Sequence, residues 1–205
     1  MALKGKDALV LERTFKLFLE GSYGSVSIAD LEKATGMARG TILYKIGNKD
    51  DLFRKVVRYY IIESQNPNNK LVEAISCNTL KEFIENYIKA SKRTMKTLSN
   101  LVEKDKNGHR CYFSLLFDAA KFVPGFAKDL KDIFNLDLRL WEINVNKAFC
   151  IGEIRRDLNP QIVAKHFRFI FSGLSFERAF LDGLDTSELE EMLMGYYDMI
   201  KNDKE

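Results

Sequence analysis

The residues best suited to chemistry in this chain lie between positions 34 and 53, in the stretch ATGMARGTILYKIGNKDDLF. Apolar residues are interspersed there with residues that are cationic, can form hydrogen bonds or are small. These are Arg39, Gly40, Thr41, Tyr44, Lys45 and Lys49. An arginine can donate two hydrogen bonds to a guanine edge, and hydroxyl and ammonium groups bind phosphates. The pattern therefore indicates a polyanionic partner, although a solvated helix face would have a similar composition.

The positive charge of the chain is concentrated around the same stretch. The net charge of +3 arises entirely in residues 1–64, which hold 11 Lys or Arg against 8 Asp or Glu, while the remainder is neutral. Between positions 34 and 58, six basic residues stand against two acidic ones. A local basic patch of this kind suits binding to a polyanion.

The spacing of apolar and capping residues places the polar set on two short helices. Ser27 and Asp30 form a capping box that predicts a helix reaching Ala34, and Gly36 provides the tight turn after it. A second short helix then fits within 38–46. Two such helices joined by a glycine turn are a helix-turn-helix, whose second helix enters the DNA major groove. Ser27, at a helix N-terminus, is expected to bind a phosphate.

The quoted stretch also carries a family resemblance. Residues 6–60, and above all LFLEGSYGSVSIADLEKATGMARGTILYKIGNKDDLF, resemble the N-terminal domain of the TetR-type (TetR/AcrR) transcriptional regulators. The resemblance implies an all-α protein with a three-helix DNA-binding domain at 1–64, its helix-turn-helix at 27–46. It assigns DNA contact to Ser27, Arg39, Gly40, Thr41, Tyr44, Lys45 and Lys49. Three positions depart from the family pattern: Ala38 replaces the capping Ser or Thr, Leu43 the tyrosine, and Ile46 the aromatic residue.

The resemblance further implies a helical effector-binding and dimerisation domain at 65–205. The segment 160–182 carries apolar residues on several faces, so we expect it to be central or to meet a second chain. The family places its dimer contact on the last two helices, here within 160–202. A homodimer through these residues is therefore predicted.

An effector pocket is also implied for the C-terminal region, where aromatic residues suit a small molecule of apolar or aromatic character. Core packing is the alternative for each of them. The candidate pocket residues are Phe113, Phe117, Phe122, Phe126, Trp141, Phe167 and Phe171.

Other kinds of site find little support in the sequence. His109 and Cys111 form a conceivable metal pair, but no second close pair gives zinc-type spacing. No nucleophile elbow, phosphate loop or HExxH motif is present, so we expect no enzyme, metal or cofactor. The absence of a signal peptide or long apolar run, together with three scattered cysteines, favours a cytoplasmic protein without a membrane partner.

These features predict a ligand-responsive regulator, a repressor released from a palindromic operator by a small molecule. The alternative is a helical ligand-binding or interaction protein whose helix-turn-helix no longer binds DNA. The departures at Ala38 and Leu43 are the features that favour this alternative.

Overall fold

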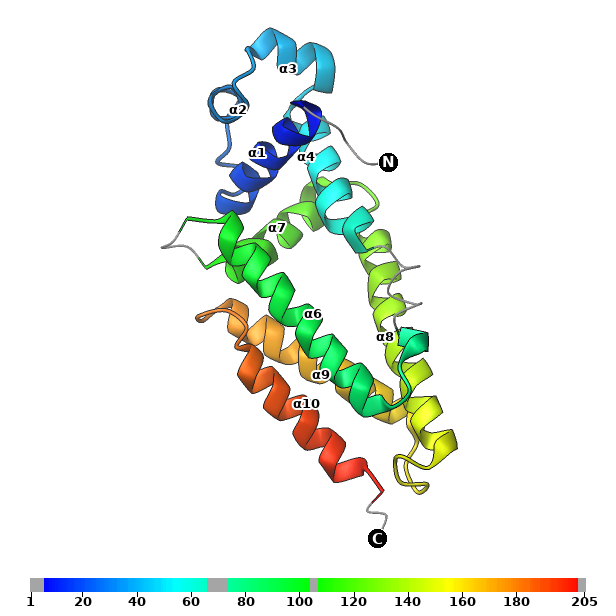
Figure 1. Ribbon diagram of the computed structural model, residues 1–205. Coiled ribbons are helices and arrows are strands. Elements are labelled where there is room, and N and C mark those ends of the chain that lie inside the picture. The colour runs from blue at the N-terminus through cyan, green and yellow to red at the C-terminus, as the bar shows by residue number, and fades with distance from the viewer. Residues whose placement is uncertain (1–5, 66–73, 104–106, 203–205) are drawn as a thin grey trace. The chain divides into compact units, whose positions relative to one another are not determined.

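The computed structural model describes residues 6–65, 74–103 and 107–202 of the 205 residues (Figure 1). Its regular elements are helices, which confirms the predicted all-α class. An isolated antiparallel bridge joins Ile154 to Lys201, and the described ranges contain no strand. None of the described helices has the length and apolarity needed to cross a membrane. The chain forms two compact units, residues 1–65 with 98–130 and residues 66–97 with 131–205.

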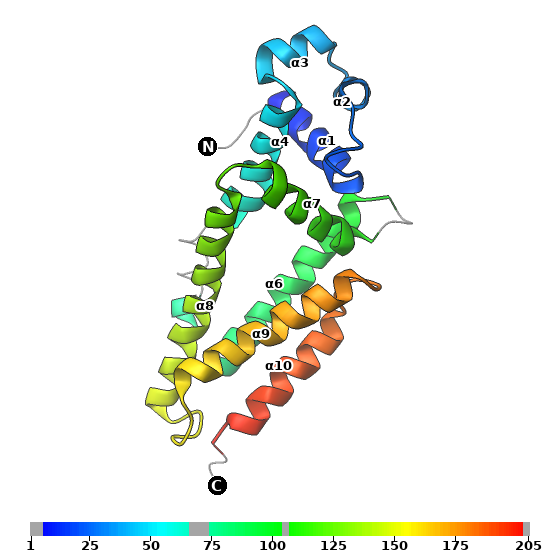
Figure 2. The ribbon, with the colours of Figure 1, turned by 180° about the vertical axis from the view of Figure 1, so that it is seen from behind.

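The first unit is built around a buried apolar cluster. Its helices are α1 (Lys6–Glu20), α2 (Ile28–Thr35), α3 (Arg39–Ile46), α4 (Lys49–Val57, prolonged by the π-helix Arg58–Ile62 and the 3-10 turn Glu63–Gln65) and α7 (Gly108–Phe122). Helix α1 contacts α2, α4 and α7 (Figures 1 and 2). Phe18, Leu31, Ile42 and Phe53 are each at most 1% exposed, so α1 to α4 all contribute to one core.

The second unit has its own core. Its helices are α6 (Leu80–Leu101), α8 (Phe126–Ile151), α9 (Pro160–Ala179) and α10 (Thr186–Ile200), of which residues 98–101 and 126–130 belong to the first unit. Helices α9 and α10 lie side by side and run in opposite directions (Figures 1 and 2). Trp141 is fully buried, stacks on Phe167 at 4.9 Å between ring centroids and meets Phe83 edge-on at 4.8 Å.

Capping residues and a left-handed glycine begin and end several helices, as the sequence predicted for Ser27 and Gly36. Ser27 and Asn48 each form the reciprocal capping box, and Gly36 adopts the left-handed conformation with φ 70°. Asn159 caps α9, with Pro160 as its first residue. Asn107 caps α7, which begins at Gly108.

The division into a DNA-binding domain at 1–64 and an effector-binding and dimerisation domain at 65–205 stays a prediction, and the two compact units have other boundaries. Residues 98–130 group with the N-terminal helices because they make contacts with the turn before α2. Asp118 accepts a hydrogen bond from the Tyr23 backbone N–H at 2.6 Å, and Phe122 stacks on the Tyr23 ring at 4.2 Å. These contacts join residues nearly a hundred positions apart, which local sequence patterns do not reveal.

A single carboxylate organises the start of α6 in the second unit. Glu153 accepts hydrogen bonds from the backbone N–H groups of Leu80 and Lys81 at 2.8 and 3.1 Å, and from the Tyr197 hydroxyl at 3.1 Å. Burial, and then the charge of Glu153, raises the pKa of Tyr197 to about 12. The hydroxyl therefore stays protonated and able to donate near neutral pH.

We expect Glu153→Ala to lower the free energy of unfolding by about 1–3 kcal/mol, because it leaves two helix N–H groups and a hydroxyl without their acceptor. Urea unfolding followed by circular dichroism measures the change. Glu191→Ala is the control, since this exposed glutamate should change stability by no more than about 0.5 kcal/mol. Equal midpoints for the two variants would refute the capping role.

Candidate nucleic-acid interface

The turn between α2 and α3 determines where α3 lies. Gly36 reverses the chain in the left-handed conformation, and the Thr35 hydroxyl accepts a hydrogen bond from the Met37 N–H at 3.3 Å. Ala38 directly precedes α3, and its carbonyl accepts hydrogen bonds from the N–H groups of Thr41 and Ile42. Ile42 is 1% exposed in the core of the first unit. The face of α3 that carries Ile42 is thereby anchored in the core, and the opposite face is exposed to solvent.

The N-terminus of α3 is capped from another helix. Ala38 has no side-chain acceptor, but the Glu32 carboxylate of α2 accepts a hydrogen bond from the Arg39 N–H at 2.6 Å. A carboxylate is favourable at a helix N-terminus, where the helix dipole is positive. The departure from the family pattern at Ala38 is thus compensated within the motif.

The outward face of α3 consists of the predicted contact residues. Arg39, Gly40 and Thr41 are exposed, and the Tyr44 side chain is 91% exposed. At this exposure the Tyr44 ring does not pack against α4. A Cβ added at Gly40 would meet nothing within 4 Å, so the helix surface there is open to a ligand. Lys45 lies on α3, but its side chain falls outside the described residues.

Lys49 begins α4 and lies against an aromatic ring. Its Nζ is 4.4 Å from the centroid of the Tyr23 ring, a cation–π geometry. The Tyr23 hydroxyl donates to the Asp50 carboxylate, and this hydrogen bond is the main reason why the pKa of Tyr23 is raised to about 12. Lys49 is therefore held at the first turn of α4, directly after its cap Asn48.

Ser27 is the N-cap of α2, as predicted. Its Oγ accepts from the Asp30 N–H at 3.2 Å and donates to Asp30 Oδ2 at 2.6 Å. The hydrogen bonds from Ser27 lower the pKa of Asp30, so the carboxylate is charged at neutral pH. Phosphate binding by Ser27 stays a prediction, and a phosphate there would meet this neighbouring charge.

Sequence reasoning missed Glu32 and Tyr23, which both precede the stretch 34–53. Glu32 caps α3, and Tyr23 lies against Lys49. The only hint for Glu32 was the missing cap at Ala38, which leaves N–H groups in need of an acceptor. Tyr23 lies in the turn GSYGS, where no periodicity indicated that its ring would be half-buried.

The seven predicted pocket residues fall in different places. Trp141, Phe167 and Phe171 belong to the aromatic cluster of the second unit, where Phe171 meets Tyr87 edge-on at 5.3 Å. The other four, Phe113, Phe117, Phe122 and Phe126, belong to the first unit. Phe126, Trp141 and Phe167 are at most 1% exposed and pack as core residues, whereas Phe117 is 60% exposed. A role of these residues in a pocket stays a prediction.

Metal-ligating side chains do not cluster in the part of the chain that the structure describes, where no group of three or more His, Cys, Asp or Glu could hold an ion. His109 is buried, and burial lowers its pKa. Cys111 lies two residues further along the same helix.

The N-terminal region is similar in sequence to known bacterial regulatory proteins. Residues 10–56 match the family described as bacterial regulatory proteins, tetR family. Over 56 residues the chain is 41% identical to the HTH-type transcriptional repressor ComR of Escherichia coli strain K12. That match covers 27% of this chain and 26% of ComR, so it spans about a quarter of the relative's length.

Solved structures extend the likeness to the whole chain. A TetR-family transcriptional regulator from Cytophaga hutchinsonii superposes with a TM-score of 0.66 at 16% identity, covering 100% of both chains. The complex of SmeT with triclosan gives a TM-score of 0.69 at 14% identity, covering 98% of this chain and 93% of that one. At these identities the likeness shows a shared fold.

The cap on α3 leads to a prediction that can be tested by rescue. We expect Glu32→Ala to destabilise the protein by about 1 kcal/mol, because the Arg39 N–H loses its acceptor. Adding Ala38→Ser should restore most of the loss, since a serine at the N-cap supplies a local acceptor. Thermal unfolding of wild type, both single variants and the double variant measures this. A loss that Ala38→Ser does not reduce would show that Glu32 acts by another contact.

Proposed function

We propose that this chain, a TetR-type regulator by its N-terminal region and its fold, is a sequence-specific DNA-binding repressor that a small molecule releases from a palindromic operator. The observation that carries the proposal is the outward face of α3. Its polar side chains are exposed while Ile42 anchors the helix, so they are available to a groove of DNA.

Each exposed residue has a distinct role in the proposal. Arg39, at the start of α3, reads a base edge with its planar fork, as an arginine does with guanine. Gly40 allows close approach of the helix to DNA, and Thr41 bonds a phosphate or touches a thymine methyl. Tyr44, Lys45 and Lys49 bind phosphates, which set the register.

The proposed homodimer uses the apolar residues that α9 and α10 leave exposed. Ile162, Phe169 and Phe176 recur every seven residues on α9 and are 46%, 58% and 49% exposed. Gly173, one turn before Phe176, has open space above it, which allows a partner helix to approach closely. An exposed apolar stripe of this kind is typical of an association surface. The stripe falls within the predicted range 160–202.

Release from DNA follows if the effector binds one state of the dimer better than another. A ligand shifts such an equilibrium only by the difference between its affinities for the two states. The complex of SmeT with triclosan supports the proposal that a chain of this fold binds a small molecule.

We expect Arg39→Ala to relax specificity at one base pair in each half-site, with a loss of about 1–3 kcal/mol in operator binding. The operator is first selected from random duplexes, and binding is then measured by fluorescence anisotropy on operator and scrambled DNA over a salt series. Lys49→Ala is the contrasting variant: it should weaken both DNAs alike and lower the salt slope by about one.

Two outcomes would contradict this assignment. If wild type shows no retention on DNA and no salt slope, the helix-turn-helix does not bind DNA and the alternative of a degenerate motif holds. If Arg39→Ala leaves base preference unchanged, Thr41 or Tyr44 reads the base instead. The selected operator should also contain two half-sites about one helical turn, or a multiple of it, apart.

We expect Phe176→Glu to convert the dimer to a monomer, because each subunit would bury a carboxylate at the proposed interface. Light scattering at micromolar concentration measures the mass. Phe117→Glu is the matched control, since this exposed phenylalanine lies on α7 outside the stripe and its replacement should leave the dimer intact. A monomeric wild type, or a dimeric Phe176→Glu variant, would exclude this interface.

A further inference from the structure

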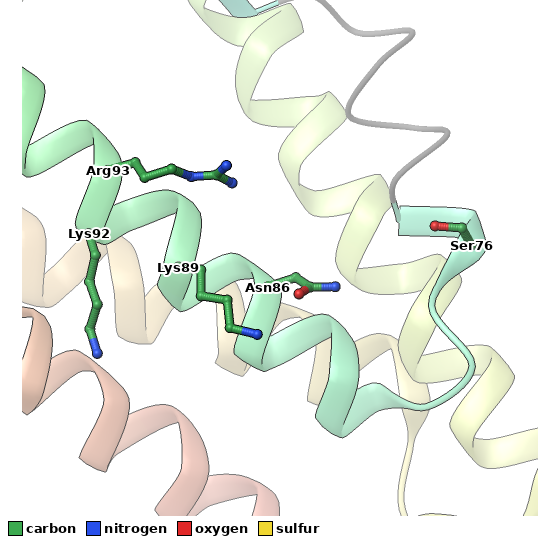
Figure 3. A pocket seen from close by; sticks show the side chains of 5 residues that line it. All are labelled: Ser76, Asn86, Lys89, Lys92 and Arg93. Carbon is green, nitrogen blue, oxygen red and sulfur yellow. The ribbon is translucent and has the colours of Figure 1, made fainter.

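The second unit contains a cavity whose lining differs from the aromatic pocket expected from the sequence. Its volume is about 640 Å³, and it is lined by Ser76, Asn86, Lys89, Lys92 and Arg93 (Figure 3). Four of these residues lie on α6, and Ser76 lies on the preceding helical segment. Among the described residues, the lining thus combines three cations and two neutral polar side chains, with no carboxylate.

The three cations of this cavity are not equivalent. Lys92 extends toward α10, where its Nζ is 2.7 Å from the Glu190 carboxylate. Within the described ranges, Lys89 and Arg93 form no ion pair. Their positions, together with Asn86, recur at intervals of three and four residues, which places them on one face of the helix. Figure 3 shows these three side chains extending toward the side of α6 on which Ser76 lies.

The acidic residues of α6 do not neutralise this pair. Glu82 Oε2 accepts a hydrogen bond from the Asn78 N–H at 2.7 Å, so it is engaged at the helix start. Glu85 lies one turn before Lys89, at the spacing that favours an ion pair, but none forms in the structure. Lys89 and Arg93 are like charges one turn apart, an unfavourable arrangement that an anion between them would make favourable.

We infer that this cavity binds a small molecule carrying carboxylate or phosphate groups. Arg93 supplies a planar fork that matches either group with two hydrogen bonds, and Lys89 supplies a second charge. Asn86 and Ser76 provide amide and hydroxyl groups for neutral parts of the ligand. The volume lies in the range typical of small-molecule sites. That this anion is the effector rests on the regulator function proposed above.

Isothermal titration calorimetry with pyrophosphate and with citrate tests the binding, at an ionic strength that is constant within each titration and is raised with KCl from one titration to the next. We expect one saturable site per chain, an affinity that falls as KCl rises, and a loss of about tenfold or more in Arg93→Gln. Lys89→Gln should also weaken binding. Lys81→Gln is the matched control, an exposed lysine on the same helix outside the cavity, and should bind as wild type does. The stronger of the two probes identifies the preferred acidic group.

Absence of saturable binding at millimolar probe, or equal binding by Arg93→Gln and wild type, would overturn the site. Circular dichroism spectra of the variants verify that they are folded. The effector statement is tested separately by adding the stronger probe to the protein–operator complex at constant ionic strength. Release from wild type but not from Arg93→Gln supports it, whereas no release from wild type overturns it. If no DNA is bound at all, the proposed function fails while the calorimetric result stands.

Discussion

The proposed recognition surface depends on how an eight-residue helix is held in place. Helices shorter than about 12–15 residues are marginal in water, so α3 cannot rely on its own backbone hydrogen bonds. Three features hold it: the left-handed turn at Gly36, the buried side chain of Ile42, and the Glu32 carboxylate on the Arg39 N–H. Because these anchors use the inner face and the first N–H, the outward side chains contribute little to folding. The outward side chains of α3 are therefore available to bind a partner.

Tyr23 ties the turn before α2 to two other parts of the first unit. Its N–H donates to Asp118 on α7, its hydroxyl donates to Asp50 on α4, and its ring stacks on Phe122. The pKa of Tyr23, raised to about 12, keeps the hydroxyl protonated and able to donate to Asp50 near neutral pH. A movement of α7 against α4 would therefore strain contacts made by one side chain. Lys49, which lies over the same ring, shares this constraint.

Local signals in the sequence predicted much of the fold, because capping boxes, a glycine turn and an Asn-Pro start depend on residues within a few positions of one another. Ser27, Asn48, Gly36 and Asn159 are examples. The features that sequence reasoning missed join distant positions. Glu153 caps a helix more than 70 residues earlier, and Asp118 binds a turn 95 residues away. At the candidate interface, the residue types on α3 could be recognised from the sequence. The cap from Glu32 could not be predicted, because it depends on how α2 and α3 pack.

Side-chain type alone does not separate a core from a ligand site. The aromatic residues that suggested an apolar effector include Trp141 and Phe167, which stack on each other with no exposed surface, so their area is already used to hold the second unit together. Lys89 and Arg93 are exposed and form no ion pair with another described residue, so a bound anion would reduce the repulsion between them. An effector shifts a regulator by the difference between its affinities for two states. A pair of exposed cations produces such a difference readily, because the attraction to one anion depends on how closely both side chains converge on it.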